Sequence, residues 1–294
     1  MGLTFYIVDV FAERKYAGNQ LAVVRGAKSL SATQMQEIAK EMSYSETTFM
    51  LSEEERDGGY DVRIFTPENE LPFAGHPTLG TAYVIQRELI KKRVEKIVLN
   101  LKVGRIPVTF SYGGEAPDLL WMQQMQPTFG RRVTPEVISE VLGLKNESVD
   151  QRFPVEEVST GVPVIITPLE TIDSLRGAKL DRDRYFRLIK DTEAKSILVF
   201  SPETRSREND LSVRFFAEYY GVPEDPATGS ANGCLAAYLV KHRYFEKDQI
   251  NVRVEQGYEI GRPSLLLLRA EDREEGIDVH VGGKVIMVAR GGLV

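Results

Sequence analysis

The chain has 294 residues, and its 42% hydrophobic and 27% charged residues are ordinary values for a globular protein of about two domains. The net charge of −6 argues against nucleic acid as a partner, because the sequence has no basic stripe to neutralise phosphates. Apolar runs such as 265–268 are too short to span a membrane, and the first residues show no signal-peptide pattern. With one cysteine, Cys234, no disulfide can form within the chain, and we expect a cytoplasmic protein.

Alternating or continuous apolar residues predict many short strands and few helices. Strands are expected at 3–11, 21–25, 47–52, 60–66, 95–101, 105–112, 118–124, 155–160, 163–168, 195–201, 211–217, 249–256, 263–270 and 284–290. Helices are expected at 32–42, 76–90, 134–143, 181–191 and 230–243, and Ser31 with Gln34 forms a capping box at the first. Strands mostly follow strands through short turns, which favours an α+β fold. The Gly-Gly stretch 112–117 is the best candidate for an interdomain linker.

One segment of the chain recurs loosely about 150 residues later, which indicates two similar domains. In both copies, 62–83 and 213–237, a Val-Arg-x-Phe strand runs into a Pro-x-x-Gly turn and then into a helix rich in small residues. Such small side chains allow a helix to pack tightly inside a curved sheet. A helix N-terminus binds anions through its free N–H groups and the positive end of its dipole. Two such termini converging on one cleft would make a carboxylate site.

The residues at the two expected helix starts are candidates for that site. Gly75 and His76 open the first helix, and Gly229 and Ser230 open the second. Their N–H groups could hold a substrate carboxylate, and the His76 imidazole could donate or carry a proton. The alternative is that the glycines only shape turns and that Ser230 only caps a helix. Asp225 precedes a proline and could be a turn former, or it could orient His76 or bind a substrate amine or hydroxyl.

Other candidate residues give weaker signals. Glu46 has nothing in its local sequence that separates it from a solvated glutamate. His242 lies at a helix C-terminus and His280 in a strand, and both are interpreted as structural or surface residues. Three scattered histidines and one cysteine offer no ligand spacing typical of a metal site. The glycines match neither a phosphate loop nor a dinucleotide fingerprint, so the sequence implies no cofactor.

Four motifs together resemble the phenazine-biosynthesis isomerase family (PhzF-like proteins). They are Gly-Asn-Gln-Leu-Ala-Val-Val at 18–24, Ser-Glu-Thr-Thr-Phe at 45–49, Phe-Thr-Pro … Ala-Gly-His-Pro-Thr at 65–78, and Glu-Asp-Pro-Ala-Thr-Gly-Ser-Ala at 224–231. The resemblance runs in order from residue 3 to the C-terminus. It implies a diaminopimelate epimerase-like fold of two domains, each a curved, mostly antiparallel sheet wrapped around a central helix. The domains would be 1–115, completed by the C-terminal strand at about 284–294, and 116–283, with the active site between them.

The same resemblance implies an activity and a set of site residues. Family members are cofactor-free homodimers, and the best-known reaction is the isomerisation of trans-2,3-dihydro-3-hydroxyanthranilate, in which a proton moves between ring carbons. The family's acid/base glutamate matches Glu46, its Gly-His pair matches Gly75 and His76, and its Asp and Gly-Ser match Asp225, Gly229 and Ser230. We therefore expect a cofactor-independent isomerase of a small carboxylated substrate. This expectation agrees with the residues, because a carboxylate held by helix ends makes a neighbouring C–H proton easier to move.

Two alternatives stay open at this point. Epimerases of the same fold carry paired thiols before the helix glycines, and the matching positions here are Ala74 and Thr228. Cys234 lies inside the second expected helix and is interpreted as core packing. An amino-acid racemase or epimerase would therefore need other bases. The second alternative is a non-catalytic binding protein, because a fold alone does not secure chemistry.

Overall fold

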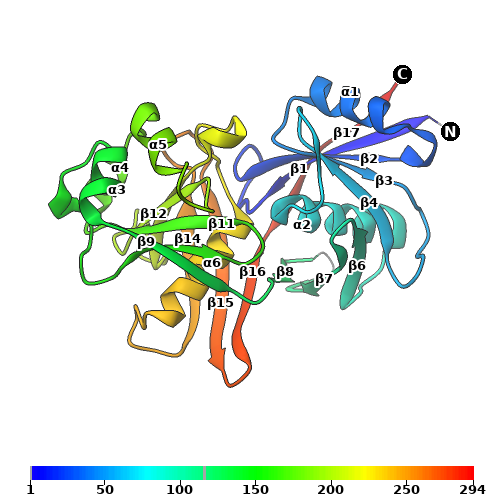
Figure 1. The fold of residues 1–294 in the computed structure, drawn as a ribbon. Helices are drawn as coiled ribbons and strands as arrows, with labels where there is room; N and C mark the ends of the chain where they lie inside the picture. The colour runs from blue at the N-terminus through cyan, green and yellow to red at the C-terminus, as the bar shows by residue number, and fades with distance from the viewer. Residues whose placement is uncertain (1, 115–116) are drawn as a thin grey trace. The chain divides into compact units, whose positions relative to one another are not determined.

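The protein is described here by a computed structural model, which covers residues 2–114 and 117–294 and shows a mixed α+β fold with a large curved sheet and few helices (Figure 1). The chain forms two compact units. The first consists of Met1–Met122 with Gly282–Val294, and the second of Gln123–Val281. The predicted domain boundary at 115 and 116, within the expected linker 112–117, lies on residues outside the described part of the chain. In the part of the chain that is described, no helix is long and apolar enough to cross a membrane.

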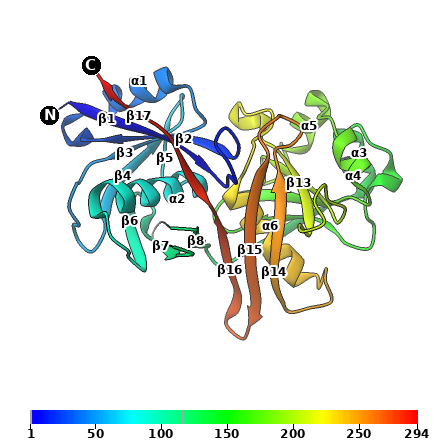
Figure 2. The same cartoon turned by 180° about the vertical axis from the view of Figure 1, so that it is seen from behind.

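The first unit is a sheet that surrounds one helix. Its strands are β1 (Leu3–Val10), β2 (Asn19–Arg25), β3 (Thr47–Met50), β4 (Tyr60–Phe65), β5 (Glu70–Leu71), β6 (Lys96–Leu101), β7 (Gly104–Ser111), β8 (Leu119–Gln123) and β17 (Val285–Leu293). Its helices are η1 (Ala27–Ser29), α1 (Ala32–Met42), α2 (Gly75–Val84) and the π-helical turn η2 (Ile85–Ile90). The last strand, β17, pairs with β1, so that Leu3 lies opposite Leu293 and the two ends of the chain run side by side (Figure 2).

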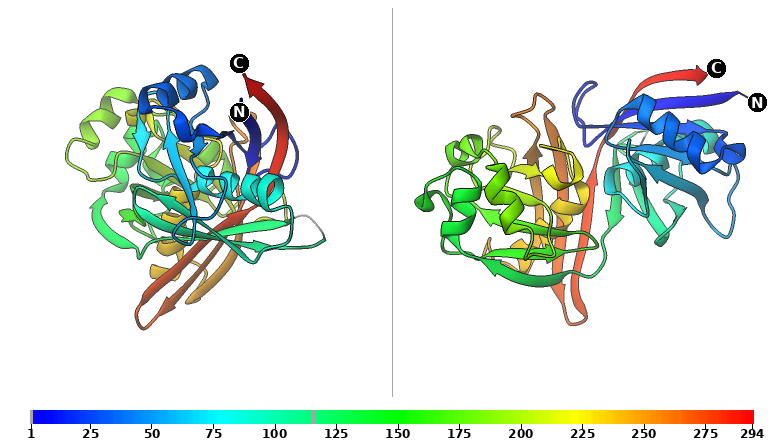
Figure 3. Two further views of the ribbon diagram at one scale, coloured as in Figure 1. Left: turned by 90° about the vertical axis from the view of Figure 1, so that its right-hand side faces the viewer. Right: turned by 45° about the horizontal axis from the view of Figure 1, so that its top comes forward.

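Helix α2 is the centre of this unit, and all of its residues are buried. It contacts β1, β2, β3, β6, β7 and β17, while α1 covers the other face of the sheet against β3 and β4 (Figure 3). This close packing requires Gly80, because a Cβ at this position would lie 2.5 Å from a methyl carbon of Leu21. The small residues of the repeat therefore do what the sequence predicted and let the sheet approach the helix.

The second unit is built in the same order. Its strands are β9 (Thr128–Val133), β10 (Val155–Ser159), β11 (Pro163–Pro168), β12 (Ile197–Ser201), β13 (Leu211–Phe216), β14 (Gln249–Gln256), β15 (Ser264–Arg273) and β16 (Gly276–Gly283). Its helices are α3 (Pro135–Val141), η3 (Asn146–Ser148), α4 (Ile172–Gly177), α5 (Arg182–Leu188), η4 (Glu218–Tyr220) and α6 (Gly229–Lys241). Helix α6 contacts β10, β11, β14 and β15 and is buried except for Ser230 and Lys241.

Strand pairing shows how alike the two units are. In the first unit, β1–β2 is antiparallel, β2–β3 parallel, β3–β4 antiparallel, β4–β6 parallel and β6–β7 antiparallel. The second unit repeats this alternation from β10 to β15. In both, the central helix follows the fourth strand of the series. The recurrence seen in the sequence is thus a recurrence of strand, turn and helix.

Most expected elements lie within a few residues of the observed ones, and the capping box of α1 is present, with Ser31 Oγ accepting from the Gln34 N–H at 3.2 Å. No element expected from the sequence covers β5, β9, β16 or α4. Strand β5 is two residues long, and β9 is mostly exposed and has no apolar alternation. Strand β16 does alternate, with Ile277, Val279 and Val281 buried, and should have been found. The helix expected over 76–90 changes to π-helical geometry after Val84.

Candidate active site

The two central helices begin at the predicted glycines, and neither is capped by a side chain. Helix α2 starts at Gly75 after the extended residue Ala74, and α6 starts at Gly229 after the extended residue Thr228. By contrast, side chains cap α1, α3, α4 and α5, through Ser31, Thr134, Thr171 and Asp181. Within the described residues, therefore, the first-turn N–H groups of α2 and α6 are not used by a capping side chain, and a helix start of this kind suits an anion.

Glu46 lies beside His76 at the start of α2. The chain reaches Glu46 between the end of α1 and the start of β3, which is parallel to β2. Glu46 Oε2 is 3.3 Å from His76 Nε2, and the two side chains are only 16% and 7% exposed. The structure thus brings together two predicted residues that are 30 positions apart in the sequence. Glu46 differs from a solvated glutamate because it is largely enclosed and lies next to His76, which its local sequence did not reveal.

His76 is held as a neutral ring. Burial lowers the pKa of His76 to about 3, and a hydrogen bond to the backbone of Gln20 opposes this shift only in part. Because that bond raises the pKa, the ring is its donor; because Nε2 faces Glu46, the donor is Nδ1. A neutral ring that is protonated on Nδ1 presents an unprotonated Nε2 to Glu46. The two side chains can then share a hydrogen bond only when the Glu46 carboxyl carries a proton.

Asp225 is fixed at the entrance to α6. Its side chain is 8% exposed, and its Oδ2 accepts a short hydrogen bond from the Thr228 hydroxyl. The backbone N–H of Asp225 donates to the carbonyl of Phe215 at 3.1 Å, which ties the turn to the end of β13. Asp225 therefore has a defined position in the second unit, three residues before the N-cap of α6.

Gln256, at the end of β14, is a residue that the sequence analysis missed. Its amide Nε2 donates to the Asp225 carbonyl at 2.9 Å and to Thr228 Oγ1 at 3.3 Å. Its Oε1 accepts from Asn232 Nδ2 at 2.9 Å and from the Thr228 N–H at 3.4 Å. Gln256 is 1% exposed, so it serves as an internal link between the turn and the first turns of α6. No sequence signal joined it to Asp225, which is 31 residues away.

The remaining cysteine and histidines have structural surroundings. Cys234 lies inside α6, fully buried, and burial raises the pKa of its thiol to about 11. His242 Nε2 lies 2.7 Å from Glu156 Oε2, and His280 Nε2 lies 3.2 Å from Asp278 Oδ1. Among residues 2–114 and 117–294, no group of three or more His, Cys, Asp or Glu side chains could hold a metal ion.

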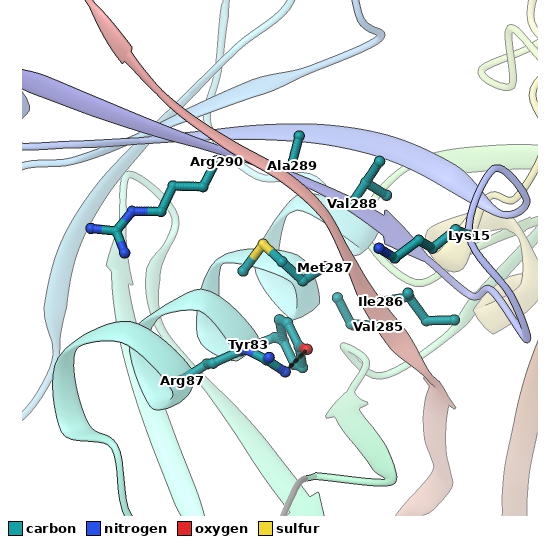
Figure 4. A pocket seen from close by; sticks show the side chains of 9 residues that line it. All are labelled: Lys15, Tyr83, Arg87, Val285, Ile286, Met287, Val288, Ala289 and Arg290. Atoms are coloured by element: carbon teal, nitrogen blue, oxygen red, sulfur yellow. Dashed lines mark hydrogen bonds between the residues drawn. The ribbon is translucent and has the colours of Figure 1, made fainter.

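A surface hollow of the first unit is separate from these residues. It measures about 430 Å³ and lies between β17 and the start of η2, with Tyr83 and Arg87 on the helical side (Figure 4). Lys15 and Arg290 border it, and Arg87 Nη1 donates to the Tyr83 hydroxyl at 2.9 Å. None of the predicted site residues lines this hollow.

Comparison with known proteins identifies the family. The model of the phenazine biosynthesis-like proteins (PhzC-PhzF) matches residues 8–291. The chain belongs to this family. A relative from Pseudomonas aeruginosa, named trans-2,3-dihydro-3-hydroxyanthranilate isomerase, is 36% identical over 288 residues, which are 98% of each chain. Together, the family and its named relatives make this protein an isomerase of the PhzF family.

Solved structures support the fold. A PhzF-family phenazine biosynthesis protein from Bacillus anthracis superposes with a TM-score of 0.90 at 24% identity and covers 100% of both chains. A probable proline racemase from Agrobacterium radiobacter superposes with a TM-score of 0.65 at 8% identity, covering 99% of this chain and 93% of its own. The fold is therefore shared with racemase-like proteins. Nevertheless, the residues before the two helix glycines are Ala74 and Thr228 here, so neither position carries a thiol.

Proposed function

We propose that this isomerase moves a proton within a small carboxylated substrate, trans-2,3-dihydro-3-hydroxyanthranilate or an analogue, and that it does so without a cofactor. Glu46 is the acid/base group of this proposal. The observation that carries it is the buried Glu46–His76 contact of 3.3 Å at a helix start that has no side-chain cap. The name of the P. aeruginosa relative supports the choice of substrate.

In this proposal backbone N–H groups at helix starts bind the substrate carboxylate. Gly75 and His76 supply them at α2, and Gly229 and Ser230 supply them at α6. Each start offers N–H donors and the positive end of a helix dipole. Negative charge that develops next to the carboxylate during proton removal is stabilised by the same donors. Asp225, fixed by Thr228 and Gln256, orients the amine or hydroxyl group of the substrate.

The proton transfer uses the two states of Glu46. As a carboxylate, Glu46 removes a proton from one ring carbon, and the electron pair of that C–H bond moves through the neighbouring double bond. As a carboxylic acid, it delivers the proton to the carbon at the other end of the rearranged system. While Glu46 carries the proton, its carboxyl group can donate a hydrogen bond to the unprotonated Nε2 of His76.

Replacement of Glu46 tests this assignment. Glu46→Gln keeps the size of the side chain but cannot take up a proton, so kcat should fall at least about a hundredfold while KM changes little. Binding is measured separately by calorimetry with anthranilate, a stable aromatic carboxylate, and should be close to that of the wild type. If Glu46→Gln turns over within a few-fold of wild type while Asp225→Ala is inactive, then Asp225 is the base and Glu46 is not.

The assembly and location of the enzyme also belong to this proposal. We propose that it works as a cytoplasmic homodimer, each chain forming two domains, and its single cysteine suits a reducing compartment. Sedimentation equilibrium should give about twice the chain mass of 33.1 kDa. A mass of one chain at micromolar concentration would exclude the dimer.

A further inference from the structure

In each unit, the fourth strand of the series carries an arginine whose guanidinium makes a bidentate contact with a glutamate that precedes the central helix. In the first unit, Arg63 on β4 donates from Nε to Glu70 Oε1 at 2.6 Å and from Nη2 to Glu70 Oε2 at 2.7 Å. Lys102 adds a third bond to Glu70, at 2.5 Å. Glu70 itself lies in β5, opposite Phe65 of β4.

The second unit has the same arrangement in a more buried form. Arg214 on β13 donates from Nε to Glu224 Oε1 at 2.9 Å and from Nη2 to Glu224 Oε2 at 2.8 Å. Its Nη1 also donates to the backbone carbonyls of Leu175 at 3.0 Å and Ala178 at 2.7 Å, at the end of α4. The side chains of Arg214 and Glu224 are only 9% and 10% exposed.

Two further features show that these pairs are equivalent. Each glutamate stands five residues before the glycine that starts the helix, Glu70 before Gly75 and Glu224 before Gly229. Each guanidinium also lies over the phenylalanine two residues further along its own strand, at 5.0 Å from the Phe65 ring and 4.8 Å from the Phe216 ring. The pairs therefore tie the segment that enters each central helix to the strand before it.

We propose that Arg63–Glu70 and Arg214–Glu224 are positioning pairs that set where α2 and α6 begin, and so where their first-turn N–H groups point. This proposal rests on the proposed role of those N–H groups in holding the substrate. A bidentate contact fixes a segment in direction as well as in distance, which a lysine cannot reproduce. We expect the Arg63–Glu70 pair to affect mainly the rate of proton transfer and the Arg214–Glu224 pair to affect mainly substrate binding. Arg63 holds the segment that leads to His76, beside Glu46, whereas Glu224 is the neighbour of Asp225 in the chain.

The chain offers a control for each pair. Arg25 makes a bidentate contact with Glu53 in the first unit, at 2.9 and 2.7 Å, and Arg152 makes one with Asp150 in the second, at 2.9 and 2.8 Å. Neither control pair lies on a segment that enters α2 or α6. Arg25→Lys and Arg152→Lys therefore report what the loss of a bidentate pair does when no helix start is involved.

The test compares Arg63→Lys and Arg214→Lys with both controls by three measurements. These are steady-state turnover of dihydrohydroxyanthranilate, calorimetry of anthranilate binding and amide hydrogen exchange. Arg63→Lys should lower kcat roughly ten- to a hundredfold, because a displacement of about 1 Å near the reacting groups can have such an effect. Arg214→Lys should instead raise KM and weaken anthranilate binding about tenfold. Exchange should accelerate at Gly75–His76 in the first variant and at Gly229–Ser230 in the second. The controls should stay within about twofold of wild type.

The comparison with the control variants decides whether the two pairs position the helix starts. If Arg63→Lys and Arg214→Lys change turnover, binding and exchange no more than their controls do, the pairs are ordinary ion pairs and the proposal is wrong. If Arg214→Lys does not fold, Glu224→Gln replaces it, since it removes the charge and keeps the shape; wild-type binding in that variant would equally overturn the proposal. An active Glu46→Gln enzyme would refute the proposed role of Glu46, whereas local exchange at the helix starts tests the positioning pairs independently of turnover.

Discussion

The starts of α2 and α6 share a backbone plan and differ in the side chains around them. Both begin at a glycine after an extended residue, and both lack a side-chain cap in the described part of the chain. At α2 the neighbouring side chains are Glu46 and His76, whose Oε2 and Nε2 atoms lie 3.3 Å apart. At α6 they form a hydrogen-bonded network in which Gln256 links Asp225 and Thr228.

If the proposed function is right, we expect this difference to give the two helix starts different roles. At α2 a carboxyl group faces an unprotonated ring nitrogen, so a protonated Glu46 can donate a hydrogen bond to His76. The network at α6 is suited to hold groups in place, because the amide of Gln256 donates and accepts at once and is fully enclosed. Variants at α2 should therefore change mainly the rate, and variants at α6 mainly the binding.

His76→Ala should have the largest effect among the variants that break this comparison. Without the ring, Glu46 loses the neighbour that can accept a hydrogen bond from its protonated carboxyl, so kcat should fall about a hundredfold, with a smaller loss of binding. Asp225→Ala serves as the counterpart at α6 and should weaken anthranilate binding more than His76→Ala does. Kinetics and calorimetry on both variants measure the contrast; equal loss of binding with no difference in kcat would contradict the expected difference in roles.

Gln256→Ala should sharpen the same comparison from the α6 side. The substitution removes the hydrogen bonds that Gln256 makes with the Asp225 carbonyl and with Asn232 Nδ2, which should weaken anthranilate binding about tenfold and destabilise the fold by about 1–3 kcal/mol. Gln123→Ala is the control, since its hydrogen bond to Asp278 is exposed. A Gln256→Ala enzyme with wild-type KM would show that the network does not position the site.

Acidification should destabilise the protein through His76. Burial lowers the pKa of His76 from 6.5 to about 3, so the unfolded chain binds a proton between these values that the folded chain does not. The contribution of neutral His76 to the free energy of unfolding is therefore fully present above pH 6.5 and is lost as the pH falls toward 3. From pH 7 to pH 5, His76 should account for about 2 kcal/mol of lost unfolding free energy. Urea unfolding of wild type and His76→Gln at both pH values checks this, and an identical loss in both would contradict it.

Cys234→Ser should have the smallest effect on activity. The thiol is buried in α6, and burial raises its pKa to about 11, so it is a poor nucleophile at neutral pH. Turnover should be nearly unchanged, and stability should fall by at most about 1–3 kcal/mol, because Thr160 Oγ1 and the Val162 carbonyl, each 3.6 Å from the sulfur, can serve as partners for a hydroxyl. Iodoacetamide should not inactivate the folded enzyme. Stoichiometric inactivation with the fold intact would return a thiol to the mechanism.

The sequence was sufficient to predict the two repeated helix starts. It did not predict the contacts between side chains that are far apart in the chain. Both helix starts followed from the recurring strand, turn and glycine. Glu46 was identified only through the family resemblance, because its distinguishing feature is His76, which lies 30 residues away in the sequence. Gln256 was missed for the same reason. The arginines of the repeat were visible, but their glutamates stand seven residues away in one copy and ten in the other, which hid the shared pairing.

The most direct test of the central claim, that Glu46 carries the proton, is turnover of dihydrohydroxyanthranilate in deuterated water with product analysis by mass spectrometry and NMR. The wild-type enzyme should place deuterium at the carbon that receives the proton, less than fully where Glu46 is shielded from solvent. Glu46→Gln should bind anthranilate normally and form no labelled product above the uncatalysed background. Labelled product formed by Glu46→Gln at a rate within a few-fold of wild type would contradict the account.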